Sequence, residues 1–366
     1  MEDRYEPEVC LVQLAVADEV LLVDPFGDVK LEPVWQLIHD SSVECIVHAG
    51  QEDLALCVQH TGVLPSCVFD VQRAAGLVGL DYPLSLQKLV QSLLHVRLHK
   101  SKTLTDWRKR PLSDTQLQYA VEDVQYLPQV RDRLGVRLAQ TGRSEWAKEE
   151  NSVFEDLTFY RRVEEEKVHH LKGTRGLRGQ QLAIVRDLLH WRDGLAQRLN
   201  RPARVVLKDH LLVEIARLCL ASAAEIRDLR GLNLSDRSIH EVVKVVSAAK
   251  NAPSETWPEP VPHDLETPRE SAFVALATAV ARGYCMENEL AYSLAATKKM
   301  IQELVRFRTN PDPEPHNHTS VQPELLQGWR GQSVGAALDE ILSGRGVISV
   351  EWTRGHPAIR VRTGEL

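Results

Sequence analysis

The sequence predicts an α/β domain with a mixed sheet, followed by all-helical domains. Up to about residue 140, β-rich runs give way to an alternation of strands and helices, which is typical of α/β proteins. After about residue 172, apolar residues recur at helical spacing with short breaks, which is typical of small helical bundles. The length of 366 residues is sufficient for two or three domains, each with its own core.

The expected sheet begins with two antiparallel strands. The runs "VCLVQLAV" and "EVLLVD" are separated by a short polar break, as in a hairpin. A third strand, "VECIVHA", precedes a helical "QEDLALCVQHTG" that ends at a glycine, and "CVFDVQRAAGLVG" runs from a short strand into a helix. "SLQKLVQSLLHV" reads as an amphipathic helix. A hairpin followed by strand–helix alternation favours a mixed sheet.

A long helix is expected to begin at Ser113, within "RPLSDTQLQYAVEDVQYLPQVRDRLGVRL". Ser113 and Gln116 have the spacing of a capping box, in which the serine side chain and the glutamine side chain satisfy the first backbone N–H groups. Tyr119 and Asp123 are four residues apart in this helix and therefore lie on one face.

Composition divides the chain into five predicted parts. They are an α/β domain (1–142), a charged helical connector (143–171), a helical domain (172–251), a proline-rich linker (252–269) and a second helical domain (270–366). The two helical domains have the character of a diverged repeat, although no residue-level match supports one.

The net charge of −7 conceals a strong asymmetry. Residues 171–250 carry 15 Lys plus Arg against 8 Asp plus Glu, a balance of +7, so the remainder carries −14. Because local charge decides what a surface attracts, this helical segment is a candidate contact for a polyanion. The alternative on charge alone is an ordinary solvated helical surface.

The six cysteines form no CxxC pair and have no zinc-like spacing, and several lie in apolar runs. This pattern favours a reducing compartment, the cytoplasm. The most apolar stretch, "VCLVQLAVADEVLLV", is interrupted by Gln13, Asp18 and Glu19 and is too short to span a bilayer. No membrane association and no obligate protein partner are expected.

Two groups of acidic residues suit metal-assisted cleavage of a phosphodiester, which needs carboxylates converging on divalent ions. Glu52 and Asp53 in "HAGQEDL" follow a strand end, where α/β sheets present groups to ligands. Glu122 and Asp123 lie one turn after Tyr119. Spacing alone does not decide between the members of either acidic pair, and each acid taken singly fits a solvated surface position better than a metal site.

Several motifs in the same order resemble those of ribonuclease D, a 3′–5′ exonuclease family of the ribonuclease-H-like superfamily. They are "HAGQEDL", "FDVQRAA" and "LHKSKTLTDWRKRPLSDTQLQYAVEDVQYL", within residues 5–140. The basic segment resembles the helicase-and-RNase-D C-terminal (HRDC) domain of that family, and "LLQGWRGQSVG" resembles its C-terminal part. The resemblance implies hydrolysis of RNA 3′ ends to nucleoside monophosphates, with tRNA precursors and other single-stranded 3′ ends as substrates.

The resemblance also implies a catalytic set of four acidic residues and a tyrosine that hold two divalent ions, Mg²⁺ or Mn²⁺. Carried over, the second motif falls on Asp53 and the third on Tyr119 and Asp123. Asp53 and Asp123 are then metal ligands, and Tyr119 helps to orient the attacking water.

The first motif of that family, Asp-x-Glu on the opening strand, has no counterpart in this numbering. Glu2 and Asp3 have the wrong order and lie too close to Tyr5 and Pro7. We therefore expect a late start site or a trimmed chain, with the first strand of the sheet missing and little exonuclease activity. The alternative is an inactive nucleic-acid-binding protein that retains the exonuclease scaffold.

Four further residues are candidates for nucleic-acid contacts. Lys100, Trp107 and Arg110 lie in "KSKTLTDWRKRP" and suit contacts to phosphate or to a stacked base. His48 ends a strand beside the expected site. The structural alternatives are a core position for Trp107, an ion pair for Arg110 and a purely structural role for His48.

Overall fold

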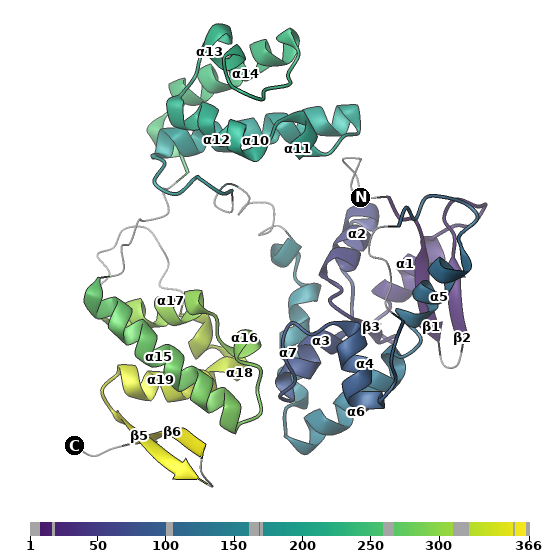
Figure 1. The fold of residues 1–366 in the computed structure, drawn as a ribbon, viewed down its shortest axis with the longest axis vertical. Helices are drawn as coiled ribbons and strands as arrows, with labels where there is room; N and C mark the ends of the chain where they lie inside the picture. The colour runs from purple at the N-terminus through teal and green to yellow at the C-terminus, as the bar shows by residue number, and fades with distance from the viewer. Residues whose placement is uncertain are drawn as a thin grey trace. The chain divides into compact units, whose positions relative to one another are not determined.

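The computed structural model describes residues 8–16, 19–99, 105–160, 168, 171–258, 267–309, 322–353 and 356–363. The chain folds into two compact units (Figure 1). The larger unit combines residues 10–157 with residues 266–366, and the smaller is formed mainly by residues 158–265. The smaller unit is thus inserted in sequence between the two parts of the larger one.

The larger unit opens with the predicted hairpin. Strands β1 (Val12–Val16) and β2 (Glu19–Val23) pair antiparallel, with Leu14 opposite Leu21. After α1 (Glu32–His39), strands β3 (Cys45–Val47) and β4 (Val68–Asp70) pair in parallel. Within the described ranges, no strand joins the hairpin to the parallel pair, so the expected mixed sheet is present as two separate pieces.

Six helices complete the first part of the larger unit. They are α2 (Gln51–Thr61), α3 (Val71–Leu77), α4 (Leu86–Leu94), α5 (Asp114–Glu122), α6 (Leu127–Gln140) and α7 (Ser144–Asn151), the last followed by a short 3-10 turn, η1 (Ser152–Glu155). Helix α2 ends at Gly62, which has a left-handed φ of 70°, as its terminal glycine predicts. The stretch expected to be a connector includes α7, whose Ala147 packs into the core.

The prediction of one long helix from Ser113 is wrong in its length. The capping box of Ser113 and Gln116 forms as expected, but α5 ends at Glu122 and α6 begins at Leu127. Pro128 explains the break: it lacks a backbone N–H, and its ring would clash with the carbonyl group four residues earlier, at Val124. The intervening turn carries Asp123 at the C-terminal end of α5.

The smaller unit is the all-helical bundle that the sequence predicts (Figure 1). Its elements are α10 (Gly179–Leu199), α11 (Ala203–Val206), α12 (Asp209–Leu218), α13 (Ala223–Arg227), α14 (Asp236–Asn251) and the 3-10 turn η2 (Ser254–Thr256). Apolar side chains of α10, α12 and α14 form a core of their own, which includes Leu188, Leu212 and Val246.

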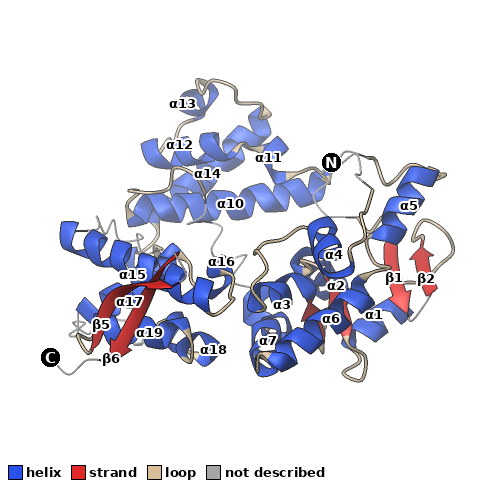
Figure 2. Ribbon diagram, turned by 60° about the horizontal axis from the view of Figure 1, so that its bottom comes forward, coloured by secondary structure: helices blue, strands red, loops and turns tan. Residues whose placement is uncertain are grey.

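The C-terminal part of the larger unit is helical and ends in a hairpin that the sequence analysis did not anticipate (Figure 2). Its elements are α15 (Pro268–Glu287), α16 (Tyr292–Ala295), α17 (Lys298–Thr309), η3 (Glu324–Leu326), α18 (Gly328–Gly331), α19 (Val334–Leu342), β5 (Gly346–Thr353) and β6 (His356–Thr363). The alternating apolar residues Ile348 and Val350 in β5, and Ile359 and Val361 in β6, are the period-two signal that was overlooked.

The two parts of the larger unit share one hydrophobic core. Buried residues of α3 and α6, such as Leu77 and Leu134, belong to the same cluster as Leu294 and Trp329 of the C-terminal part. Gly76 permits the close approach, because a Cβ there would lie 2.7 Å from a methyl group of Leu294. The backbone N–H of Ala291 also donates to the Gly76 carbonyl at 2.8 Å. The C-terminal segment is therefore part of the fold that carries the first 157 residues.

Candidate active site

Asp53 lies in the first turn of α2, directly after the parallel strand β3. The chain turns from strand to helix at Ala49, which has a positive φ of 54°, and at Gly50, which precedes the helix. Gly50 is required by space, since a Cβ there would lie 2.6 Å from the side chain of Val47. The side chain of Asp53 is exposed. The pKa of its carboxyl group is nevertheless raised, first because nearby protein atoms exclude water and second because Glu52 carries a like charge.

The buried carboxylate of Asp70 holds this turn in place. It accepts hydrogen bonds from the backbone N–H groups of Ala49 at 3.1 Å and of Gly50 at 3.3 Å. It also caps α3 by accepting the N–H of Gln72 at 2.8 Å. These bonds fix the backbone just before α2 begins, so Asp70 helps to position the helix that carries Asp53.

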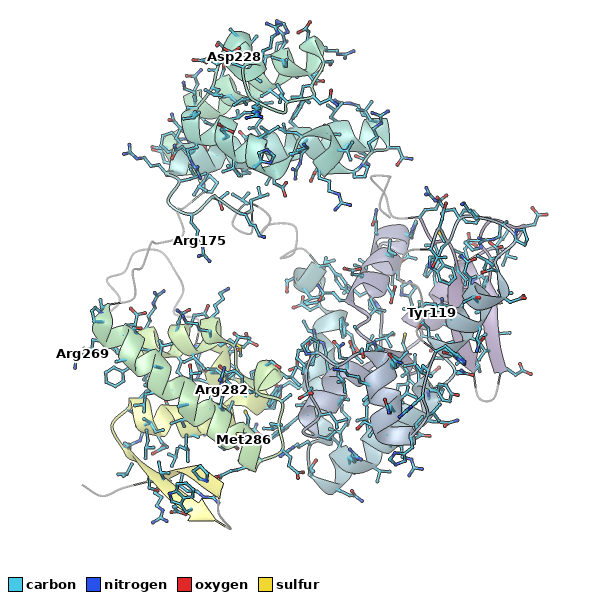
Figure 3. All side chains as sticks on the ribbon, viewed as in Figure 1. Tyr119, Arg175, Asp228, Arg269, Arg282 and Met286 are labelled. Atoms are coloured by element: carbon cyan, nitrogen blue, oxygen red, sulfur yellow. The ribbon has the colours of Figure 1, made fainter. Side chains whose placement is uncertain are left out.

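Tyr119, labelled in Figure 3, lies in α5, and Asp123 follows it at the C-terminal end of that helix. The four-residue spacing places both on one side of the last turn of α5, and the Tyr119 hydroxyl hydrogen-bonds the Asp123 carboxylate. The ring of Tyr119 contacts the ring of Trp107, with centroids 5.9 Å apart at 43°. Two separate elements, α2 and α5, thus bring together the three residues that the resemblance selects.

Burial is the main reason that the pKa of Asp123 is raised to about 6. The hydrogen bond from Tyr119 lowers this pKa, whereas the negative charges of Glu122 and Asp53 raise it. Asp53 and Asp123 therefore lie close enough to repel each other, in surroundings that solvate charge poorly. A site with these properties favours a cation, which would relieve both costs.

Glu122, the acid next to Asp123, lies in a different environment from Asp53 and Asp123. Glu122 points away into protein contacts: its carboxylate accepts the backbone N–H of His99 at 2.8 Å and contacts the His99 ring at 2.5 Å. Burial raises the pKa of Glu122, but these bonds and one from Gln118 outweigh burial and leave the pKa below its usual value. Glu122 is thus engaged by His99 and Gln118, whereas the charge of Asp53 acts on Asp123.

The other candidate contacts are placed differently. Nε2 of His48 donates a hydrogen bond to the Leu84 carbonyl at 2.8 Å. This bond is consistent with the structural role given above as the alternative for His48. Arg110 pairs with Asp24 at 2.5 and 2.7 Å and bonds the Cys10 carbonyl at 2.8 Å, which is the ion pair given above as its structural alternative. Trp107 is half-buried beside Tyr119. Lys100 lies outside the described residues.

The donor chemistry at this site suits a hard divalent cation, because carboxylate oxygens are the ligands that Mg²⁺ and Mn²⁺ prefer. In the described ranges, no third His, Cys, Asp or Glu joins Asp53 and Asp123 in a metal-binding group. The two carboxylates therefore suit a divalent ion as two members of a larger set of ligands.

A cavity of about 910 Å³ lies elsewhere, between α15 and β6. It is lined by Arg282 and Met286 among others (Figure 3), and none of the three site residues contributes to it. Among the helices that the structure describes, none has the length and apolarity needed to cross a bilayer.

Asp70 is the residue at the site that sequence reasoning missed. Its motif, "FDVQRAA", contributes to the resemblance to ribonuclease D, but the sequence analysis assigns no role to the aspartate in it. An aspartate between a strand and a helix is a strong capping signal, and this signal could have identified it. Its second role is to bond the backbone of the turn at Ala49 and Gly50. Local sequence patterns do not reveal this role, because the bonded residues are 20 or more positions apart in the chain.

Comparison with known proteins specifies the class of protein to which this strand–helix scaffold and its paired acids belong. The sequence model of the 3′–5′ exonuclease family matches residues 2–139, and that of the HRDC domain matches residues 181–245. The chain is therefore a 3′–5′ exonuclease with an HRDC domain.

Whole-chain relatives identify the family. The chain is 32% identical to the ribonuclease D of Gluconacetobacter diazotrophicus over 96% of this chain and 88% of that protein. It is 28% identical to the Escherichia coli ribonuclease D over 92% and 89%. The crystal structure of the latter, described as an exoribonuclease involved in structured RNA processing, superposes with a TM-score of 0.77 and 27% identity over 93% of this chain and 90% of that one. The chain belongs to the ribonuclease D family and is a hydrolytic 3′–5′ exoribonuclease.

Proposed function

We propose that the chain removes nucleotides from RNA 3′ ends at Asp53, Tyr119 and Asp123, with both aspartates as ligands of divalent ions. The observation that carries this proposal is the state of Asp123. Its carboxylate is half-buried, repelled by Asp53 and bonded by the Tyr119 hydroxyl, so it combines a cation-binding group with a hydroxyl beside it.

Each residue has a distinct task in this proposal. The bound ion would acidify water and stabilise the leaving oxygen. Asp53 and Asp123 hold negative charge where that ion is needed, from two elements fixed by separate contacts. The Tyr119 hydroxyl can donate to or accept from a water molecule beside Asp123 without competing as a charged ligand. Trp107, packed on Tyr119, limits the movement of the phenol ring.

The metal is Mg²⁺ or Mn²⁺ in this proposal, since both take oxygen ligands. Two carboxylates carry two negative charges, whereas two divalent ions carry four positive charges. We infer that a pair of ions needs acidic ligands beyond Asp53 and Asp123, as the Asp-x-Glu motif of the family would supply.

We expect Tyr119→Phe to lower kcat on the order of 10²-fold while leaving the fold intact, because one positioning hydrogen bond is lost. Loss of the Tyr119 donor should also raise the pKa of Asp123 above about 6. More of that carboxyl group is then protonated near neutrality, so the acidic limb of the pH–rate profile should move to higher pH. Release of 3′-terminal nucleotides from an RNA oligomer between pH 5 and 9 measures both effects.

Tyr126→Phe is the matched control for this experiment. Tyr126 lies in the same turn, at the start of α6, but is not a cause of the raised pKa of Asp123. Its substitution should leave the rate and the pH profile unchanged. If Tyr119→Phe behaved like Tyr126→Phe, the proposed role of Tyr119 would be wrong.

We further propose that the HRDC unit holds the RNA through its phosphates and that tRNA precursors are among the substrates. The unit has its own core and an excess of basic residues, 15 against 8 acidic over residues 171–250. Arg201, Arg204 and Lys208 are exposed along the short connection that includes α11. A cationic surface attracts a phosphate backbone irrespective of sequence.

Isolated residues 171–258 are expected to bind single-stranded RNA with an affinity that falls steeply with salt and depends little on sequence. Replacing Arg201, Arg204 and Lys208 together by Ala should weaken binding and reduce the salt slope by about 2 to 3, because each cation that neutralises a phosphate contributes about one to that slope. Arg237, which pairs with Glu241 at 3.3 Å, provides a control substitution. Salt-independent binding would exclude a phosphate-based role for this unit.

We place the protein in the cytoplasm, where its RNA substrates are found. The six cysteines are free thiols, as suits a reducing compartment. Burial raises the pKa of Cys45 to about 11 and that of Cys285 to about 12, which keeps these two thiols protonated and unreactive.

A further inference from the structure

Helix α7 lies between the C-terminal part of the larger unit and the turn that carries the active site (Figure 2). Its last turn holds two consecutive polar residues that are almost completely buried, Glu150 and Asn151, which are 6% and 2% exposed. Buried polar groups are retained only where they are well paired. The partners of these two residues lie in different parts of the chain.

Glu150 is held by both parts of the larger unit. One carboxylate oxygen accepts a bond from Arg73 of α3 at 2.8 Å. The other accepts the indole N–H of Trp329 and a guanidinium N–H of Arg330, each at 2.9 Å. Trp329 and Arg330 belong to α18, in the "GWRG" stretch of the C-terminal part.

Two further contacts fix α18 against α7. The backbone N–H of Trp329 lies 3.0 Å from both carboxylate oxygens of Glu149, and the ring of Trp329 stacks on that of Trp146 with centroids 5.4 Å apart. Gly328 allows this approach, since a Cβ there would lie 1.6 Å from the Glu149 carboxylate. Three successive residues of the C-terminal part therefore determine the position of α7.

The opposite side of the same helical turn leads to the active site. The side-chain oxygen of Asn151 accepts the backbone N–H of Asp70 at 3.1 Å, while its amide group donates to the Ala147 carbonyl at 2.8 Å. Asp70 in turn accepts hydrogen bonds from the backbone N–H groups of Ala49 and Gly50, which directly precede α2, the helix that carries Asp53. An unbroken series of contacts thus runs from Trp329 to the start of the helix that bears Asp53.

We propose that Asn151 and Asp70 are positioning residues of the active site, and that the C-terminal part sets their geometry by clamping α7 through Trp329 and Arg330. The "GWRG" stretch would then serve catalysis although it contacts no substrate. This inference rests on the proposed role of Asp53. A displacement of a ligating carboxylate by a fraction of an ångström is enough to slow a reaction that depends on alignment.

Arg143 separates this role from simple attachment of the C-terminal part. Its guanidinium bonds the carbonyl groups of Leu77 at 2.8 Å, Glu289 at 2.9 Å and Asn288. It therefore links the same two parts of the larger unit. It also lies over the ring of Trp146, 5.4 Å from the centroid, but no bond joins it to Glu150, Asn151 or Asp70. A variant at Arg143 removes these links and keeps the hydrogen bonds that run from Trp329 to Asp70.

The direct test is hydrogen–deuterium exchange of the full chain, followed in a peptide that covers residues 48–54. Asn151→Leu, which keeps the size of the side chain and removes the acceptor, should speed exchange in this peptide about tenfold. Trp329→Phe, which keeps an aromatic ring but loses the N–H donor and part of the buried volume, should speed it severalfold. A peptide from α4, residues 86–94, reports global opening and should remain unchanged in both variants. Arg143→Met should leave residues 48–54 as in the parent.

Activity measurements complete the test. Asn151→Leu and Trp329→Phe should lower kcat about tenfold and severalfold, with KM for RNA within twofold of the parent, whereas Arg143→Met should lower only the melting temperature. Equal exchange at residues 48–54 in all variants, or the same acceleration in Arg143→Met, would overturn the proposal. Faster exchange with unchanged kcat would preserve the series of contacts but contradict its role in catalysis. A Tyr119→Phe variant as fast as the parent would instead contradict the proposed site itself, so the two failures are distinguishable.

Discussion

Asp123→Asn is expected to reduce kcat on the order of 10³-fold and, at pH 7, to make the protein more stable. The loss of rate follows from removal of a charged oxygen ligand beside the attacking water. The gain in stability follows from the pKa, which is about 6 in the folded chain against a usual value of 3.8. Ionised Asp123 therefore opposes folding above pH 6, by about 1–3 kcal/mol, and this cost disappears as the pH falls below about 4. Denaturant unfolding at pH 4 and pH 7 measures the difference.

Glu122→Gln is the matched control and should have the opposite signature. The pKa of Glu122 is lowered despite its burial, because His99 and Gln118 bond its carboxylate. Its ionised form therefore contributes stability above the usual pKa of 4.5, and this contribution is lost as the pH falls through the lower folded value. At pH 7 the substitution should destabilise the protein and leave kcat within a few-fold of the parent. If the two variants exchanged these outcomes, Glu122 would be the ligand.

Trp329→Ala should lower the melting temperature of the larger unit by about 10 °C while the smaller unit melts as before. Trp329 is fully buried, and truncation of a buried tryptophan costs about 3–5 kcal/mol. The indole also stacks on Trp146 and bonds Glu150, so the substitution leaves a buried acid short of one donor. Differential scanning calorimetry of the full chain should show two transitions, because the two cores are separate.

Trp191→Ala provides the reciprocal variant. Trp191 packs against the core of the smaller unit and donates its indole N–H to Glu241 at 3.1 Å. Its truncation should lower only the transition of the smaller unit. A single transition that shifts in both variants would mean that the two units unfold together.

The sequence predicted those parts of the fold that local patterns determine. The hairpin of β1 and β2, the capped start of α5 and the end of α2 at Gly62 each follow from alternation, capping or a terminal glycine. The break before Pro128 was readable as well and was overlooked. The shared core could not be foreseen, because the pairing of α3 with residues beyond 290 depends on contacts more than 200 positions apart.

In the candidate site, too, local sequence patterns predicted some features, whereas others depend on contacts between distant segments. The strand-end position of Asp53 and the helical spacing of Tyr119 and Asp123 were predictable from the residues, but the choice between neighbouring acids was not. In the structure Glu122 is buried and bonded to His99, whereas the charge of Asp53 acts on Asp123, and both environments depend on segments that are distant in sequence. The support of the site by Asp70, Asn151 and Trp329 depends on three segments that are distant in sequence.

The order in which the core is assembled along the chain has a consequence for synthesis on the ribosome. The first 157 residues emerge well before Val274 to Leu338, which complete their core. At a translation rate of about 5–20 residues per second, the interval is about 10–40 s. The HRDC unit, whose core is contained within residues 168–249, can fold during that time. The nascent exonuclease part meanwhile exposes apolar surfaces of α3 and α6, and we expect it to depend on chaperones until the last hundred residues have been made.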